Sequence, residues 1–566
     1  MKIKSFATLA LAAFAFASCS KMGELSKDNF TVTPSPLEAT ANQVPVVING
    51  KFPEKYMKKK ATVTVTPVLR FAGKEVVGAP TTFQGEKVQG NNQEISYKLG
   101  GNYTMRVTFP FQDEMEGQSE LYLTFDAKKG KKTYNVPEVM VATGVNATSA
   151  KLKDAAKELG AYSKDAYQQI IKQSQESQIK YLINQSKVRL SELKTASIEE
   201  FVNVLRQIKA DQKGLAIEGI EISAYASPDG KESFNEKLAE ARQKTSAAYV
   251  QKQLKEIDLN TTLDTKYTAE DWEGFKELVA ASNIQDKEVI IRVLSMYSDP
   301  EERERQIKNI SAAYTELVDE VLPELRRARL TVNYMLIGRT DAEIAQQYSE
   351  DASKLSVEEL LYLATLENST AKKKEVYTQT TKFFPNDYRA YNNLANICLK
   401  ENQIQAAQGF MERAAALNDK AAEVNANLAA LAMVKGNVAE GEKFIGRAAS
   451  AENYQAVLAN LQAQKGDYKA AAKTAMGTKS SSAALAQVLN KDYAGALATL
   501  NSLNADQKTA TSEYVKAICA ARTNNVDAAI SALKSSFSMD PSMKERAKKD
   551  MEFATLFGNA AFKALF

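Results

Sequence analysis

The sequence has no histidine among its 566 residues. Histidine is the side chain that most often serves as a general base or a metal ligand near neutral pH. Its absence excludes Ser-His-Asp and Cys-His catalytic sites and histidine-ligated metal centres. The phosphate-binding motif G-x-x-x-x-G-K-[ST] and the G-x-S-x-G motif are also missing. We therefore expect a protein that is not an enzyme and that needs no metal and no cofactor.

Cysteine is scarce as well, with three in the whole chain. Cys398 and Cys519 each lie within an apolar helical pattern, so we expect both to be small buried core residues. A disulfide would require their two segments to be close neighbours. Cys19 stands apart from them, directly after an apolar run.

Neither a strong charge of one sign nor a long hydrophobic run is present. The 73 basic and 69 acidic residues leave a formal net charge of +4. This near-balance argues against nucleic acid as a partner, because phosphate binding needs a concentrated basic surface. No segment approaches the roughly 18 apolar residues of a transmembrane helix. A chain of this length predicts several domains.

The N-terminus has the features of a signal peptide, with basic residues followed by an apolar run over 6–17. Phe16-Ala17-Ser18-Cys19 resembles a bacterial lipobox. The resemblance implies that residues 1–18 are removed, that Cys19 carries the lipid, and that residues 19–27 form a tether. We expect a lipoprotein anchored in the outer membrane and facing the periplasm.

Residues 28–147 favour an immunoglobulin-like β-sandwich. Short β-branched and aromatic runs alternate there with turns that contain Gly, Pro and Asn. The expected strands are 46–48, 61–68, 95–99, 103–109 and 120–125. Residues 148–177 are polar and predict a helical connector.

Residues 178–340 alternate strand and helix, with strands over 179–183, 216–226 and 329–337 and helices over 198–208 and 233–254. Ser227-Pro228-Asp229-Gly230 is a tight turn. With the following Asn235-Glu236-Lys237-Leu238-Ala239-Glu240-Ala241-Arg242, it resembles the OmpA-like domain, in the form found in Bacteroidetes lipoproteins. The resemblance implies an α/β sandwich.

It also implies non-covalent binding of peptidoglycan. In that family an aspartate meets the ammonium of the stem peptide and an arginine binds its carboxylate. Arg242 occupies the arginine position, and a planar guanidinium suits a carboxylate. Ser227 stands at the aspartate position, with Asp229 two residues further on. The alternative is that Asn235 and Arg242 only hold the turn against the helix.

Residues 341–566 contain a repeat. The spacing of large and small residues at Tyr391, Leu394, Ala395, Cys398, Ala407 and Ala414 recurs 34 positions later at Asn425, Leu428, Ala429, Ala432, Gly441 and Ala448. The pattern resembles the tetratricopeptide repeat (TPR) and implies five or six helix pairs between about 355 and 541, stacked as an all-α solenoid. Asn392, Asn393 and Asn396 lie near the face that lines the groove in such repeats. They suit an extended peptide, or they form a solvated polar face.

These features together predict a non-enzymatic scaffold of the cell envelope. The membrane is bound through Cys19, a protein or peptide partner through the repeats, and peptidoglycan through the OmpA-like domain. One alternative is an accessory factor for assembly of an outer-membrane or secretion complex, with an OmpA-like domain that no longer binds peptidoglycan. A more distant one is a carboxylate-based cell-wall hydrolase.

Overall fold

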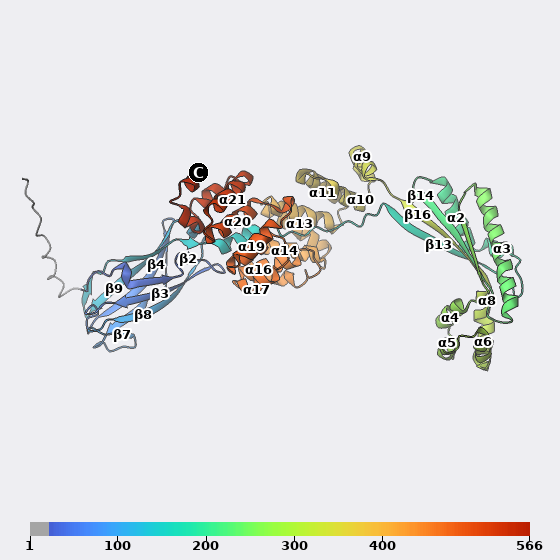
Figure 1. Cartoon of the computed structure of the whole chain (residues 1–566), viewed down its shortest axis with the longest axis horizontal. Coiled ribbons are helices and arrows are strands. Elements are labelled where there is room, and N and C mark those ends of the chain that lie inside the picture. The colour runs from blue at the N-terminus through green and yellow to red at the C-terminus, as the bar shows by residue number, and fades with distance from the viewer. Residues whose placement is uncertain (1–21) are drawn as a thin grey trace, which may run out of the picture. The chain divides into compact units, whose positions relative to one another are not determined.

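The computed structural model describes residues 22–566, so the predicted signal peptide and Cys19 lie outside the described residues. The chain forms two compact units. One comprises the described residues up to Asp165 together with Leu360–Phe566, and the other comprises Ala166–Glu359. The protein is multidomain, with an N-terminal β-sheet region, a mixed α/β middle and a TPR-like helical C-terminal region (Figure 1). The α/β unit is thus an insertion in the sequence of the other unit.

The β-sheet region consists of two main sheets that share one hydrophobic core. One sheet has the order β1-β3-β8, and the other is centred on β4 and β9. Side chains of β3 alternate between buried and exposed, and Val46 and Ile48 share the core with Val65 and Leu123 of the second sheet. The strands are β1 (Phe30–Thr33), β2 (Leu37–Glu38), β3 (Gln43–Phe52), β4 (Thr62–Phe71), β5 (Lys74–Val77), β6 (Thr81–Gly85), β7 (Gln93–Ile95), β8 (Gly101–Pro110), β9 (Ser119–Lys129), β10 (Lys132–Tyr134), β11 (Val139–Thr143) and β12 (Val145–Asn146).

Two predictions for this region are wrong. The predicted tether is not free after residue 21, because Met22 and Leu25 are buried in the core of the β-sheet region. Apolar side chains of this size gain about 1.5–3 kcal/mol from such burial. The strand expected over 95–99 ends at Ile95, because the backbone turns back there through a bridge between Ser96 and Gly100.

The connector is helical only at its start. Helix α1 spans Lys151–Ala156, the chain is then extended, and residues Ile170–Lys180 form strand β13. The helical prediction for 148–177 is therefore wrong after Ala156. The first half of β13 is exposed, so its polar sequence lacks the alternating apolar residues that identify a half-buried strand.

The inserted unit contains a four-stranded sheet in the order β13-β16-β14-β15, in which only β14 and β15 are parallel. Its other strands are β14 (Leu215–Tyr225), β15 (Leu263–Thr268) and β16 (Arg327–Ile337), and helices α2 (Ala196–Ala210) and α3 (Glu232–Ile257) share its core. The predicted strands over 216–226 and 329–337 and both predicted helices are confirmed. The strand predicted at 179–183 instead begins at Ile170, and β15 was not predicted.

A small helical subdomain follows β15 and has its own apolar core, which includes Phe275, Ile290 and Ile307. Its elements are α4 (Trp272–Ala281), α5 (Lys287–Met296), α6 (Pro300–Lys308), α7 (Ser311–Glu316), a π-helical turn (Leu317–Val321) and α8 (Leu322–Leu325). After β16, helix α9 (Asp341–Asp351) also belongs to this unit, so the repeats begin later than residue 341.

Within residues 22–566, six helix pairs form the TPR-like region, as the 34-residue period predicts. They are α10 (Val357–Leu366) with α11 (Thr370–Phe383), α12 (Tyr388–Lys400) with α13 (Ile404–Leu417), α14 (Ala422–Val434) with α15 (Val438–Ile445), α16 (Tyr454–Gln464) with α17 (Tyr468–Thr474), α18 (Ser481–Leu489) with α19 (Tyr493–Asn501), and α20 (Ala510–Arg522) with α21 (Val526–Met539). Helices α22 (Met543–Ala547) and α23 (Ala560–Lys563) follow them. Cys398 and Cys519 are buried and free, as predicted.

Candidate functional site: the repeat groove and the Ser227 turn

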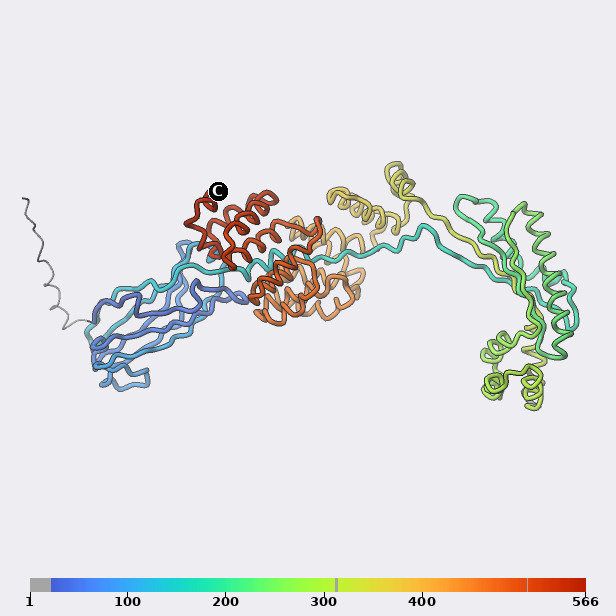
Figure 2. The backbone as a smooth tube through the Cα atoms, in the orientation of Figure 1, coloured from blue at the N-terminus to red at the C-terminus, as the bar shows by residue number. Residues whose placement is uncertain are grey.

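Residues 151–165, which we call the groove segment, lie along the first helices of the repeat pairs (Figure 2). We call the surface formed by α12, α14, α16 and α18 the repeat groove. Leu152 packs in the apolar core of the C-terminal repeats, and Leu159 packs in the core that includes α14 and α16. The surface expected to hold a separate peptide therefore holds part of this chain.

The side-chain amide of Asn393, in α12, both accepts a hydrogen bond from the Ser163 backbone and donates one to it. The Ser163 amide donates to Asn393 Oδ1 at 2.7 Å, and Asn393 Nδ2 donates to the Ser163 carbonyl at 3.0 Å. Both residues are almost fully buried. A side-chain amide thus takes the place of a neighbouring strand and satisfies both backbone groups.

Ala161 is held in the same way, one repeat further along. Its amide donates to Asn427 Oδ1 at 2.6 Å, and its carbonyl accepts from Asn427 Nδ2 at 2.8 Å and from Asn392 Nδ2 at 3.0 Å. Asn427 also donates to Asn392 Oδ1 at 2.8 Å. Because these amides bind backbone groups, this part of the segment is recognised by its extended conformation.

The contacts continue toward the start of the segment. Asn460 of α16 donates to the Leu152 carbonyl at 3.0 Å, and Asn453 donates to the Leu159 carbonyl. Ser163 Oγ donates to Glu423 at 2.9 Å. The segment is bound along most of its length.

Asn396 has a different role from the one predicted for it. A Cβ atom on Gly160 would lie 1.8 Å from Asn396 Oδ1 and 2.3 Å from its Cγ. The Asn396 amide is buried without a hydrogen-bond partner among the described residues. Asn396 therefore packs against the backbone of the groove segment at a position where only glycine fits.

Sequence reasoning placed Asn392, Asn393 and Asn396 on the groove but missed Asn427 and Asn460. The signal was present, because Asn427 lies 34 residues after Asn393 and Asn460 lies 33 residues after Asn427. Extending the period from the apolar positions to these asparagines would have identified them.

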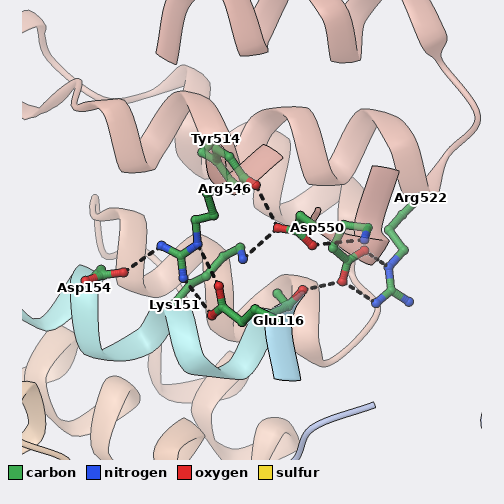
Figure 3. A network of polar contacts seen from close by, with 9 residues as sticks. Glu116, Lys151, Asp154, Tyr514, Arg522, Arg546 and Asp550 are labelled. Carbon is green, nitrogen blue, oxygen red and sulfur yellow. Dashed lines mark hydrogen bonds and ion pairs between the residues drawn. The ribbon is translucent and has the colours of Figure 1, made fainter. Parts of the chain in front are cut away.

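A network of charged groups joins the start of the groove segment to the last helices and to the β-sheet region (Figure 3). Arg546 donates to both carboxylate oxygens of Glu116, at 3.2 and 2.9 Å, and to Asp154 at 2.9 Å. Lys151 pairs with Asp550 at 2.8 Å, and both side chains are almost fully buried. One arginine thus links three parts of the chain that are distant in sequence.

These pairs change the titration of the acids. Burial alone would raise the pKa of Asp550. The neighbouring Lys151 ammonium lowers it by more than burial raises it, so the pKa lies below the usual value of 3.8. For Asp154, burial is likewise outweighed by its bonds to Arg546. Both groups therefore favour the ionised, paired state.

A cleft of about 1120 Å³ lies beside this network. Two pairs lie among its charged side chains, Lys74 with Glu114 at 2.9 Å and Arg70 with Glu75 at 3.4 Å. The lining holds six carboxylates and four basic side chains, so the cleft carries a small acidic excess.

Arg242 of α3 does not face a ligand pocket, so its predicted placement is wrong. The side chain is 1% exposed. Its guanidinium donates to three backbone carbonyls, those of Gln185 at 3.0 Å, Tyr225 at 2.7 Å and Leu182 at 3.3 Å. Burial lowers its pKa to about 10. This arginine ties α3 to β14 and to the loop after β13.

The other three predicted peptidoglycan residues are also bound within the chain. Ser227 Oγ donates to Asp229, and Asp229 lies 3.6 Å from Arg326. Asn235 is buried and donates to the Ser227 carbonyl at 3.2 Å. The structure brings these residues together, but they contact one another.

The helical subdomain covers this turn. Glu304 of α6 accepts a hydrogen bond from the Gly230 amide at 3.0 Å. The space lined by Pro228, Asp229 and Trp272 has a volume of only about 10 Å³, which is about the smallest volume that holds one water molecule. A stem peptide has no room there in this structure.

No family model matches the chain, and no curated protein matches it. Its structure is similar to that of a tetratricopeptide repeat protein from Parabacteroides merdae, with 14% identity, a TM-score of 0.30, and coverage of 44% of this chain and 98% of that one. Pseudomonas aeruginosa pilF matches with 15% identity, a TM-score of 0.25, and coverage of 39% and 98%. Yeast Tom70 matches with 12% identity, a TM-score of 0.26, and coverage of 60% and 76%.

Over residues 22–566, no helix has both the length and the apolar character needed to cross a membrane. In the same range, no group of three or more Cys, Asp or Glu side chains is placed to hold a metal ion.

Proposed function

We propose that this protein is a non-enzymatic scaffold of the cell envelope whose TPR-like repeats clamp a segment of their own chain. The observation that carries the proposal is the two-way binding of the Ala161 and Ser163 backbones by Asn427 and Asn393. The clamp fixes the β-sheet region to the repeats. The inserted α/β unit then emerges from the end of the groove segment as a module for a further protein partner.

A competition experiment tests the clamp. A fluorescent peptide of residues 148–166 is titrated with the full chain and with a chain carrying Gly160→Ala and Ala161→Pro, which removes an amide donor and adds a clashing Cβ. We expect the peptide to bind the variant and not the wild type, because in the wild type the tethered segment competes at high effective concentration. Equal binding to both chains would show that the groove is open. A scrambled peptide is the control.

We propose that the inserted unit resembles OmpA-like domains in fold without binding the stem peptide through Arg242. Support comes from the three carbonyl partners of that guanidinium and from the helical subdomain over the turn. The full chain is expected to sediment equally with and without purified sacculi, and to release no soluble muropeptides. Specific co-sedimentation of the chain with sacculi would support the hypothesis of peptidoglycan binding. Release of muropeptides would support the hypothesis of a cell-wall hydrolase.

Attachment to the outer membrane through a lipid on Cys19, with the protein facing the periplasm, is part of the same proposal. It rests on the lipobox-like sequence before Cys19. Metabolic labelling with a palmitate analogue is expected to mark the wild type and not Cys19→Ala. A wild-type chain without label would contradict the lipidation of Cys19 but would not affect the proposal that the repeats clamp the groove segment.

A further inference from the structure

Three loops meet at one end of the β-sheet region. They are residues 51–60, which run from the end of β3 toward β4, residues 85–100, which run from the end of β6 through β7 toward β8, and residues 126–132, which include the end of β9 and its turn into β10. The Lys87 amide donates to the Lys59 carbonyl at 2.6 Å, and the Lys55 amide donates to the Tyr97 carbonyl at 2.7 Å. The ammonium groups of Lys58 and Lys132 lie over the same ring, that of Tyr134, at 5.1 and 5.3 Å. We call this end the lysine tip.

The tip holds a concentrated positive charge. The three loops contain eleven lysines and four carboxylates, a net charge of +7, whereas the whole chain has +4. The remainder of the chain is therefore slightly acidic, and the near-balance of the full sequence conceals a local excess. The lysines are Lys51, Lys55, Lys58, Lys59, Lys60, Lys87, Lys98, Lys128, Lys129, Lys131 and Lys132. All of them except Lys58 are exposed.

The chain enters the described structure at this end. Tyr56 in the first loop donates to the Gly23 carbonyl at 3.1 Å, and Met22 is buried in the adjoining core. Two residues lie between Cys19 and Met22, so the three residue steps span at most about 11 Å. That length is close to the Debye length of about 8–10 Å in physiological salt, so charges at the tip are not fully screened from a surface that holds Cys19.

The tip also exposes an apolar side chain. Leu99, next to Lys98, is 78% exposed. An exposed aliphatic group on a lysine-rich surface suits a membrane interface, which has phosphates at its surface and hydrocarbon beneath them.

We propose that the lysine tip is a binding surface for the phosphate-bearing headgroups of anionic membrane lipids. It acts together with the lipid on Cys19 and so rests on the proposed function for its role in the cell. The headgroups hold the β-sheet region close against the membrane, which a single flexible anchor would not do.

The test uses the full chain with Cys19→Ser, so that no lipid contributes to binding, and vesicles of phosphatidylcholine with or without about one-third phosphatidylglycerol. We expect binding only to the anionic vesicles, weakened as salt is raised. Replacing Lys60, Lys87, Lys98 and Lys131 by Gln should weaken it about fivefold for each lysine that contacts headgroups. The matched control replaces Lys469, Lys473, Lys479 and Lys534, four exposed lysines of the repeats, by Gln and loses the same net charge.

Equal binding by the tip variant and the control variant would overturn the proposal, as would equal binding to neutral vesicles. Tighter binding to a short DNA duplex than to anionic vesicles would overturn it in favour of a nucleic-acid surface. Thermal unfolding of both variants checks that they are folded. Because the chain tested carries no lipid, a failure of lipidation in the cell leaves this result unaffected.

Discussion

The side-chain amide of Asn393 and the backbone of Ser163, 230 residues apart in the sequence, form a closed pair of hydrogen bonds in a buried site. Together with the Asn427–Ala161 pair, this relationship turns a repeat surface of the kind expected to bind other proteins into an internal clamp. The organisation of the unit follows from it, because the clamped segment connects directly to the β-sheet region and to the inserted unit.

Asn393→Ala is expected to lower the free energy of unfolding by about 2–4 kcal/mol. The substitution leaves a buried N–H and a buried C=O of Ser163 without partners, and each such group costs about 1–3 kcal/mol. Chemical denaturation of the repeat-containing unit measures the change. Asn386→Ala, at an exposed position just before α12, is the control and should change stability by less than about 0.5 kcal/mol.

Gly160→Ala is expected to destabilise the protein by about 1–3 kcal/mol, because the new methyl group clashes with Asn396 in a packed site. Adding Asn396→Ala should recover most of the loss, since it removes the clashing amide, which has no hydrogen-bond partner to lose among the described residues. Thermal unfolding of the two single variants and the double variant forms a mutant cycle. Simple additivity of the two effects would show that the residues are not in contact.

Acidic pH is expected to weaken the network of charged groups shown in Figure 3. Asp550 and Asp154 have a lower pKa in the folded chain than their usual value of 3.8. Their stabilisation is therefore complete above about pH 4, the region of the unfolded pKa, and is lost as the pH falls through the lower folded pKa. The stability difference between wild type and Asp550→Asn should shrink as the pH falls below about 4.

The comparison variant for this prediction is Asp126→Asn, which alters a pair exposed to solvent. Its stability difference from the wild type should be small throughout, because such pairs contribute little. A difference between wild type and Asp550→Asn that does not change with pH would contradict the assigned role of the Lys151–Asp550 pair.

Arg242→Ala is expected to destabilise the inserted unit by about 3 kcal/mol or more, because three carbonyls lose a charged donor. Arg206→Ala, at an exposed position on α2, should have little effect. Limited proteolysis within residues 166–359 separates this outcome from effects on the repeats. If Arg242→Ala is as stable as the wild type, the guanidinium is not the structural tie described above.

The sequence predicted the parts of the fold that have strong periodicity. The 34-residue repeat, β14 and β16 carry regular apolar patterns, and these elements were found close to the predicted bounds. Helix α3 was also predicted, although its buried face includes the polar residues Asn235, Arg242 and Ser246. The failures have physical causes. Strand β13 is an edge strand with an exposed first half, so it lacks the alternation that reveals a strand.

The occupant of the groove could not be predicted for a different reason. Ala161 and Ser163 are bound through backbone groups, which are common to nearly all residues, so the sequence at these positions carries little information about the partner. The role of Arg242 likewise depends on carbonyls contributed by Leu182, Gln185 and Tyr225. A motif specifies which side chain is present, but the loops that surround it decide whether that side chain faces a ligand or the interior.

Hydrogen exchange at the amides of Ala161 and Ser163 in the full-length wild-type chain tests the clamp most directly. Both amides donate to buried asparagine side chains, so we expect them to exchange at rates close to those of amides in α12 and α14, and far more slowly than in a free peptide of the same sequence. Exchange of these two amides at the free-peptide rate would contradict the account, because the groove would then be empty in solution.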